Sequence, residues 1–427
     1  MKKYKWLAVM LMGSMLTGCG QSAQLLTTPQ GGKENQRMTE ETGTKTTEVS
    51  VEMTANEALW HFSHGLLEQN LKETNPVLSP VSAYLALGMV ALGAEGDTLA
   101  EFENTMGKEL QSISGDLIQA IPGWIQDNGN DDKKSLLEVA NSVWVDDRMH
   151  PADEWVKSVD EIYKAEAFQG RLSDQGVMKD INDWVENKTH SLVKEFLKEP
   201  LSDDSRLALF NTIYFLGKWV NEFEPNSTYK EDFTTSGGDV KQVDMMHDFG
   251  RMEYYVQGNG MDGVVMDYRD GSMALVALKP TAGQTVREMY KSLTYDELTT
   301  LLDSGANRKV NLKLPKFEVE FDKNLNETLQ NMGIKRAFDG NLAEFGGLGT
   351  TDDGYPLCIS LVRQKAVVKL DEEGTEAAAV TMVVMMECAA IESTEVPVDV
   401  FFDEPFLYMI MDMETKTPLF MGILDEP

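Results

Sequence analysis

Apolar residues recur at three- and four-residue spacing in the first half of the chain, and at alternate or continuous positions in the second half. The first pattern is typical of helices with one buried face, and the second of strands. Predicted helices cover residues 55–70, 79–93 and 177–197, and the buried face of the last comprises Trp184, Val185, Leu192, Val193 and Phe196. Predicted strands cover residues 207–215, 263–268, 273–278, 309–320, 366–370, 398–402, 406–412 and 419–424. Helices that come first and strands that dominate the end predict an α+β fold.

The first 19 residues have the pattern of an exported lipoprotein. Three early lysines precede an apolar stretch at residues 6–16, which is too short to span a bilayer and is typical of an export signal. The stretch runs into Leu16-Thr17-Gly18-Cys19, which resembles the lipobox of bacterial lipoproteins. The alternative is an ordinary signal peptide with an incidental cysteine. The resemblance implies a signal peptide over residues 1–18 and a lipid on Cys19, which would anchor the protein to a bacterial membrane at the cell surface or outside the cell.

Residues 20–53 are rich in Thr, Gln, Glu, Gly and Lys and have almost no apolar periodicity. Such a segment buries too little surface to offset its chain entropy, so residues 19–54 are predicted to form a flexible tether behind the lipidated cysteine. A random coil of this length reaches roughly 30–35 Å end to end. No comparable linker recurs, and residues 55–427 are predicted to form one domain.

Composition and missing motifs exclude several functions. The formal net charge of −32 repels phosphate backbones, so nucleic acid is not an expected partner. No G-x-S-x-G elbow accompanies the five histidines, and the chain is not expected to be an enzyme. His61 and His64 lie three residues apart, but no third ligand has matching spacing, so they are predicted to be packed or surface residues. No metal or other cofactor is expected.

Seven short motifs occur in order along residues 55–427. They lie at residues 75–82 (continued at 86–89 and 92–94), 141–145, 181–189, 211–219, 314–317, 404–406 and 418–422. In this order and spacing they resemble the serpins, a family of protease inhibitors. The resemblance implies an α+β serpin fold with three β-sheets, about nine helices and an exposed reactive-centre loop. It also implies a monomeric suicide inhibitor: a serine or cysteine protease cuts the loop, which then inserts into the central sheet and traps the covalent acyl-enzyme.

The loop can be tested for this role from its residues. Its hinge resembles that of inhibitory serpins and consists of Glu372, Glu373, Gly374, Thr375, Glu376, Ala377, Ala378, Ala379, Val380 and Thr381. In a strand, alternate side chains face opposite sides, so Thr375 shares a small, uncharged face with Ala377 and Ala379, while Glu376 faces the other way. A small-residue helix or a flexible surface loop is the alternative. The alternation favours a strand that can enter a sheet.

Other site residues follow from the resemblance one by one. Those that match the polar cluster beneath the opening sheet are Asn75, Ser79, Ser82 and Asn211, with Gln364 where a histidine is common. Trp219 matches the tryptophan at the end of the sheet where insertion begins. The family's hinge-to-cleavage spacing places the reactive bond between Cys388 and Ala389, with Met385 and Met386 as rivals. No Arg or Lys lies between Gly374 and Phe402, which favours elastase-like proteases over trypsin-like ones.

Two other functions compete with inhibition. A non-inhibitory serpin that acts as a binding or chaperone-like module would typically carry bulky, charged or proline residues in the hinge segment that inserts. A secreted enzyme would need a catalytic constellation that the sequence lacks. Cys388 is also open to a redox role as an exposed loop thiol.

Overall fold

The computed structural model describes residues 22–27, 53–124, 136–191, 193–269, 271–281, 283–352, 354, 356–375 and 396–427. Its helices are α1 (Ala55–Glu68), α2 (Pro80–Ala91), α3 (Gly96–Met106), α4 (Leu110–Trp124), α5 (Asp153–Tyr163), α6 (Gln175–Lys188), α7 (Val286–Ser292), α8 (Tyr295–Asp303) and α9 (Asn326–Met332). Its strands are β1 (Gln24–Leu25), β2 (Val77–Leu78), β3 (Leu136–Val145), β4 (Met149–Pro151), β5 (Glu166–Gln169), β6 (Leu207–Lys218), β7 (Thr228–Thr234), β8 (Val240–Gly258), β9 (Met261–Asp267), β10 (Met273–Pro280), β11 (Ala306–Pro315), β12 (Phe317–Asn324), β13 (Gly349–Thr351), β14 (Leu361–Leu370), β15 (Gly374–Thr375), β16 (Val398–Phe401), β17 (Phe406–Asp412) and β18 (Thr417–Leu424).

In the described part of the chain the strands form three sheets, and nine α-helices accompany them. The largest sheet has the order β16-β11-β8-β9-β10-β17-β18-β2, with β7 paired to β8. The central sheet has the order β1-β5-β3-β6-β15-β14-β12, and β4 pairs with β13 in the smallest. The predicted α+β architecture of three sheets and nine helices is therefore confirmed.

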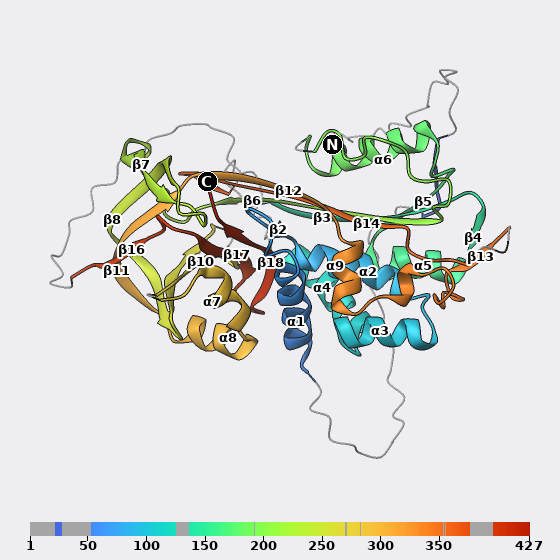
Figure 1. Cartoon of the computed structure of the whole chain (residues 1–427), viewed down its shortest axis with the longest axis horizontal. Helices are drawn as coiled ribbons and strands as arrows, with labels where there is room; N and C mark the ends of the chain where they lie inside the picture. Colours follow the sequence, from blue (N-terminus) through green and yellow to red (C-terminus); the bar gives the residue numbers. More distant parts are fainter. Residues whose placement is uncertain are drawn as a thin grey trace, which may run out of the picture.

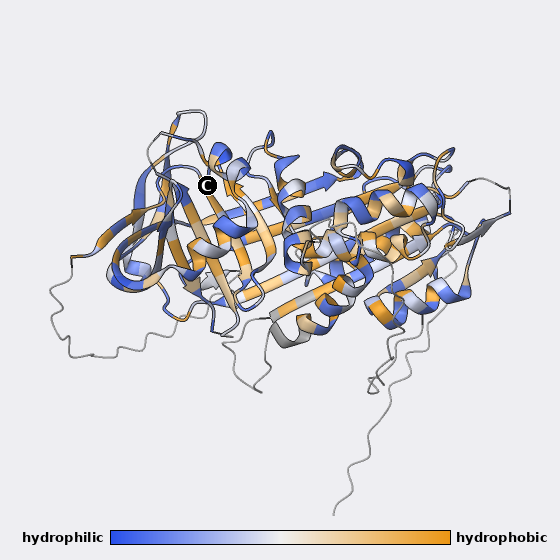
Figure 2. Ribbon diagram, turned by 90° about the horizontal axis from the view of Figure 1, so that it is seen from below, coloured by the Kyte–Doolittle hydropathy of each residue, from blue (hydrophilic) through white to orange (hydrophobic). Residues whose placement is uncertain are grey.

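The central sheet separates two helical layers (Figure 1). Helix α6 lies on one face and contacts β6, while α2 contacts β6 and β3 from the other face, together with the helices around it. Pro80 at the first turn of α2 has no N–H to leave unsatisfied, and all twelve residues of the helix are buried. A helix that is apolar all round must lie inside the domain. Figure 2 shows hydrophobic residues concentrated along the central strands and hydrophilic residues in the outlying turns.

A second, smaller apolar cluster lies between α6 and the central sheet. Its buried members include Trp144 of β3, Ile181 and Trp184 of α6, and Phe210 of β6, and Phe196 packs edge-on against Phe210. The cluster holds α6 on the sheet. Helix α6 therefore covers β6 through its own apolar interface, separate from the main core.

Some predicted elements have different bounds in the structure. The expected helix over residues 177–197 ends at Lys188, and the described residues 189–191 and 193–197 are non-helical, although Val193 and Phe196 are buried as expected. Leu192 lies outside the described residues. The expected strand over residues 309–320 is two strands, because Lys316 separates β11 in the largest sheet from β12 in the central sheet. The buried positions shift by one residue across the break, from Val310, Leu312 and Leu314 to Phe317, Val319 and Phe321.

The predicted tether is described only over residues 22–27 and 53–54. Residues 22–27 lie against the domain, where β1 pairs with β5 at the edge of the central sheet. A docked strand differs from the uniform coil expected for residues 19–54, because Gln24 and Leu25 pair with the free edge of β5 and Leu26 packs against the main core. Within the described residues, no helix is both long and apolar enough to cross a membrane.

Candidate functional site

The central sheet is closed at one end and held apart at the other. Strands β6 and β14 pair in parallel over four residues, from Ala208 with Leu361 to Asn211 with Gln364. At the far end β15 stands between them and is antiparallel to both, with Thr375 opposite Gly217 on one side and Leu370 on the other. Between the two ends, residues 212–216 of β6 and 365–369 of β14 have no pairing with each other in the described residues. The sheet therefore contains a slot, with β15 at its mouth.

Thr375 is fixed inside the mouth of the slot. Its side chain is 2% exposed, and its Oγ1 lies 2.5 Å from the hydroxyl oxygen of Tyr268. Tyr268 in turn stacks on Trp219, with ring centroids 4.6 Å apart, and meets Phe215 edge-on. A buried hydroxyl keeps its position only if it is hydrogen-bonded, so Tyr268 selects a small polar residue at position 375.

Glycine is required at position 374 by close approach. A Cβ built on Gly374 would lie 1.8 Å from the carbonyl oxygen of Gly217 on the neighbouring strand β6. No side chain fits there unless the two strands separate. Because Gly217 in turn leaves room for the rings of Phe215 and Tyr268, the two glycines together let β15 enter the mouth of the slot.

Backbone hydrogen bonds hold the hinge to the end of β6. The Trp219 backbone N–H donates to the carbonyl oxygen of Glu373 at 2.9 Å, and its indole N–H donates to that of Asp371 at 3.0 Å. The backbone N–H of Phe223 donates to the carbonyl oxygen of Glu372 at 2.9 Å. Trp219 thus lies at the end of the sheet where β15 enters, next to the hinge.

Two ion pairs secure the same hinge. Lys316 donates to the Glu372 carboxylate at 2.6 Å, and Lys218 donates to Glu373. Burial raises the pKa of Glu372, but hydrogen bonds, with that from Lys316 the largest, outweigh it and hold the pKa below its usual value. Burial raises the pKa of the neighbouring Asp371. The acidic residues before Thr375 therefore anchor the hinge through β6 and through the chain between β11 and β12.

A buried polar cluster lies where β6 and β14 first pair. The side-chain amide of Gln364 accepts from the backbone N–H of Ser79 at 2.9 Å and donates to its carbonyl oxygen at 2.8 Å. The Asn211 side chain donates to that of Asn141. The hydroxyls of Ser79 and Ser82 and the Asn211 Oδ1 find no hydrogen-bond partner among the described residues, although all three residues are buried. This cluster ties α2 to the closed end of the slot.

Asn75 lies apart from this cluster. Its Oδ1 accepts from the backbone N–H groups of Asp425 and Glu426, at 2.7 and 3.0 Å, and its own backbone N–H donates to the Asp425 carboxylate. It adopts a positive φ of 48°, which asparagine tolerates. Asn75 therefore fastens the C-terminus to the end of the segment before β2.

The structure adds residues that sequence reasoning missed. Tyr268, Lys218 and Lys316 all contact the hinge, and Asn141 joins the polar cluster. Lys218, Lys316 and Asn141 lie inside motifs singled out in the sequence, but only the fold shows what they contact. Tyr268 had no such signal, because it is 107 residues from Thr375.

Several predicted positions lie outside the described residues: Cys19, Glu376, Ala377, Ala378, Ala379, Val380, Thr381, Met385, Met386, Cys388 and Ala389.

His64 stacks on Tyr290 at 4.5 Å, and its Nε2 donates to the Tyr290 carbonyl oxygen at 2.8 Å. No group of three or more metal-binding side chains occurs among the residues that the structure describes.

Comparison with known proteins agrees with this geometry. Residues 56–427 match the family model described as serpin (serine protease inhibitor). The chain is 33% identical to Iripin-3 of Ixodes ricinus over 353 residues (82% of this chain, 88% of the relative), and 32% identical to alpha-1-antitrypsin of Meriones unguiculatus over 372 residues (86% and 88%). Its fold is similar to that of the native thermophilic serpin tengpin, with a TM-score of 0.78, 29% identity and coverage of 90% of this chain and 96% of the other.

Proposed function

The chain belongs to the serpin family of protease inhibitors, and we propose that it inhibits by inserting its cleaved loop into the slot between β6 and β14. The observation that carries the proposal is β15: the first two residues of that strand already stand in the mouth of the slot, antiparallel to both neighbours. The trapped protease remains covalently attached as an acyl-enzyme.

The register of β15 defines the path of insertion. Because Thr375 lies opposite Gly217 and Leu370, continuing the antiparallel register places residues 376–380 opposite 216–212 of β6 and 369–365 of β14. Five residues can thus enter without breaking an existing strand pair. Residue 381 then meets Asn211 and Gln364, the last pair of the closed end. Further insertion must separate the four closed pairs, which makes the polar cluster around Gln364 the gate.

The same register assigns each inserted side chain to a face. Directly opposite residues in paired strands share a face. Position 376 would lie beside Lys369 on the outer face, where Glu376 gains an opposite charge. Position 377 would lie between Phe215 and Val368, whose side chains are buried, and Ala377 is small enough to fit. The alternation of the hinge therefore suits both faces of the slot.

Full insertion explains the trap. Twelve residues from Gly374 onward would run along the whole of β6, from Lys218 to Leu207. At ~3.3 Å per residue the moving end travels about 40 Å. A strand hydrogen-bonded on both sides gains roughly 0.5–1.5 kcal/mol per bond, so about ten bonds supply energy on the order of 10 kcal/mol. The uncut state must therefore be metastable and kinetically held.

Specificity depends on the residue before the cut bond. The family spacing favours Cys388–Ala389, with Met385 and Met386 as rivals, and each offers a small or apolar side chain. An elastase-like serine protease has a matching pocket, and a cysteine protease of similar preference is a further target. Trypsin-like proteases find no basic residue in the loop.

We also place the inhibitor outside the cell, anchored through a lipid on Cys19. The Leu16–Cys19 sequence supports this location. Ala23 in the docked edge is the fourth residue after Cys19, which bounds their distance at about 14 Å. The anchor therefore holds the domain close to the membrane rather than at the end of a long tether.

Incubation with pancreatic elastase tests the proposal. A covalent complex that survives denaturing electrophoresis is expected, together with a released C-terminal peptide whose mass locates the cut bond. Trypsin is the matched control and should form no complex through this loop. Cleavage by elastase without any covalent band would instead support a non-inhibitory binding module.

A further inference from the structure

Residues 22–27, here called the strap, form an extra edge on the central sheet. Within it, β1 pairs antiparallel with β5, and beyond β1 the Leu26 N–H donates to the Ala167 carbonyl oxygen at 2.7 Å. The Ala167 N–H returns a bond to the Thr27 hydroxyl at 3.3 Å, and Thr27 is buried. A strand that carries its own hydrogen bonds and a buried end is part of the sheet, although it lies 26 residues before Met53, where the described chain resumes.

The strap also holds helix α6. The N–H of Ala23 donates to the Asp180 carboxylate at 2.8 Å, and Ala23 packs on the apolar cluster between α6 and the sheet. A Cβ on Gly170 would lie 3.1 Å from the Cα of Ala23 and 2.9 Å from Val177 of α6, so the absence of a side chain there allows this close approach. The strap thus bridges the sheet edge and α6.

Helix α6 in turn controls the chain that covers the slot. Asn182 of α6 donates to the carbonyl oxygen of Leu197 at 2.8 Å and accepts its N–H at 2.7 Å. Between these residues, Thr189 and Val193 line a cavity of about 10 Å³ with residues 213–215 of β6 and with Lys365 and Val367 of β14. That cavity has room for roughly one water molecule. A strand that enters the slot must therefore displace the segment after α6.

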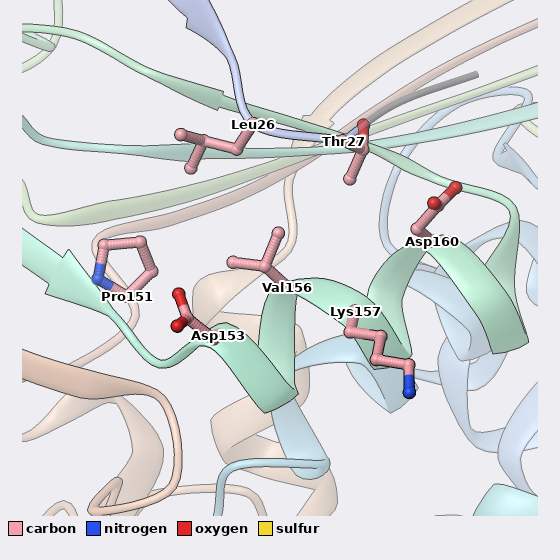
Figure 3. Close-up of a pocket in the computed structure, with 7 residues that line it drawn as sticks. All are labelled: Leu26, Thr27, Pro151, Asp153, Val156, Lys157 and Asp160. Carbon is pink, nitrogen blue, oxygen red and sulfur yellow. The ribbon is translucent and has the colours of Figure 1, made fainter. Parts of the chain in front are cut away.

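The strap borders a cavity on the side of α5 (Figure 3). Leu26 and Thr27 face Pro151 of β4 and Val156 of α5 across a cavity of about 320 Å³. Asp153, Lys157 and Asp160 line the same cavity. A segment held by a few hydrogen bonds beside such a space separates more easily than the strands of the core.

We propose that the strap is a releasable restraint on sheet opening. Docked, it holds α6 and, through Asn182, the segment over the slot; released, it lets that segment move and speeds strand insertion. This inference rests on the proposed insertion into the slot. Because the strap begins three residues after Cys19, tension on an N-terminal anchor would act directly on it.

Proline substitutions in the full chain test the strap. Ala23→Pro removes the N–H that binds Asp180, and Leu26→Pro removes the N–H that binds Ala167. Asp180→Ala removes the same contact from the α6 side. Gln24→Ala is the control, because its side chain is exposed. Each variant is studied by hydrogen exchange of α6 and by the rate at which a synthetic peptide with the sequence of residues 375–386 enters the sheet.

Both proline variants and Asp180→Ala should exchange α6 amides at least several-fold faster and take up the peptide several-fold faster than the wild type. Gln24→Ala should match the wild type. Unchanged α6 exchange and peptide uptake, in variants whose β5 amides show that the strap has been released, would overturn the restraint and leave the proposed function intact. Peptide uptake by no form, the wild type included, would overturn insertion itself and the strap's role in it.

Discussion

Replacing Thr375 by arginine tests the hinge most severely. The Thr375 side chain is 2% exposed and bonded to Tyr268. Losing that bond costs about 0.5–1.5 kcal/mol, and burying an unpaired guanidinium in its place costs several kcal/mol more. The uncut protein avoids this cost by keeping the hinge out of the slot, but the inserted state cannot.

In the proposed mechanism, insertion of the cut loop competes with completion of proteolysis. The rate of insertion therefore decides whether the protease is trapped or released. If the transition state for insertion carries about 3 kcal/mol of the penalty, insertion slows about 100-fold. Elastase should then cut Thr375→Arg and escape, so the number of inhibitor molecules consumed per protease inactivated rises steeply. Titration of residual elastase activity measures this number, and denaturing electrophoresis shows cleaved inhibitor in place of complex.

Glu376→Arg is the matched control, because it adds the same side chain one residue along, on the outer face. A like charge opposite Lys369 costs roughly 0.2–1 kcal/mol, so trapping should remain close to the wild-type yield. Equal trapping by Thr375→Arg and the wild type would refute the assignment of position 375 to the buried face.

Three further predictions concern the hinge and the gate. Gly374→Ala should expel β15, because the new Cβ would lie 1.8 Å from the carbonyl oxygen of Gly217 on β6. Hydrogen exchange at Thr375 and at the end of β14 should then accelerate, and unchanged protection would contradict this. Gln364→Ala should leave the backbone N–H and C=O of Ser79 unpaired, at a cost of about 1–3 kcal/mol. The denaturant concentration at the midpoint of unfolding should therefore fall, and conversion to an inserted form should be faster. An unchanged midpoint would contradict the role of Gln364 as the gate. The pKa of Glu372 is lowered from its ordinary value of 4.5, so its stabilising contact with Lys316 is present above that pH and is lost as the pH falls through the folded-state pKa. The stability advantage of the wild type over Glu372→Gln should therefore shrink in acid. A difference that stays constant with pH would contradict the contact.

The sequence predicted the fold class and single strands better than the points where one element ends and the next begins. Residues 406–412 are a strand with the predicted bounds, because a continuous apolar run is buried on both faces. The helices α3, α4 and α5 were not predicted, although α5 has a clear apolar stripe of Trp155, Val159 and Tyr163. The break at Lys316 was missed, although the alternation changes phase there, from Val310, Leu312 and Leu314 to Phe317, Val319 and Phe321. Only the fold shows that the two halves belong to different sheets.

Contacts between residues that are far apart in the sequence limited how much of the site could be predicted. The hinge alternation predicted which side chains share a face, but the contact that fixes Thr375 comes from Tyr268, 107 residues earlier. Asn75 was expected beneath the sheet, and its partners lie 350 residues away at the C-terminus. The docking of residues 22–27 depended on a free sheet edge that no local pattern reveals.

Hydrogen exchange before and after loop cleavage tests the central claim most directly. A protease that cuts in the loop without being trapped converts the chain to its cleaved form, and exchange is then measured at residues 212–216 of β6 and 365–369 of β14. The amides of these residues that face the slot should change from weak to strong protection, because the inserted strand pairs with both. Equal exchange in the intact and cleaved forms would contradict insertion between β6 and β14.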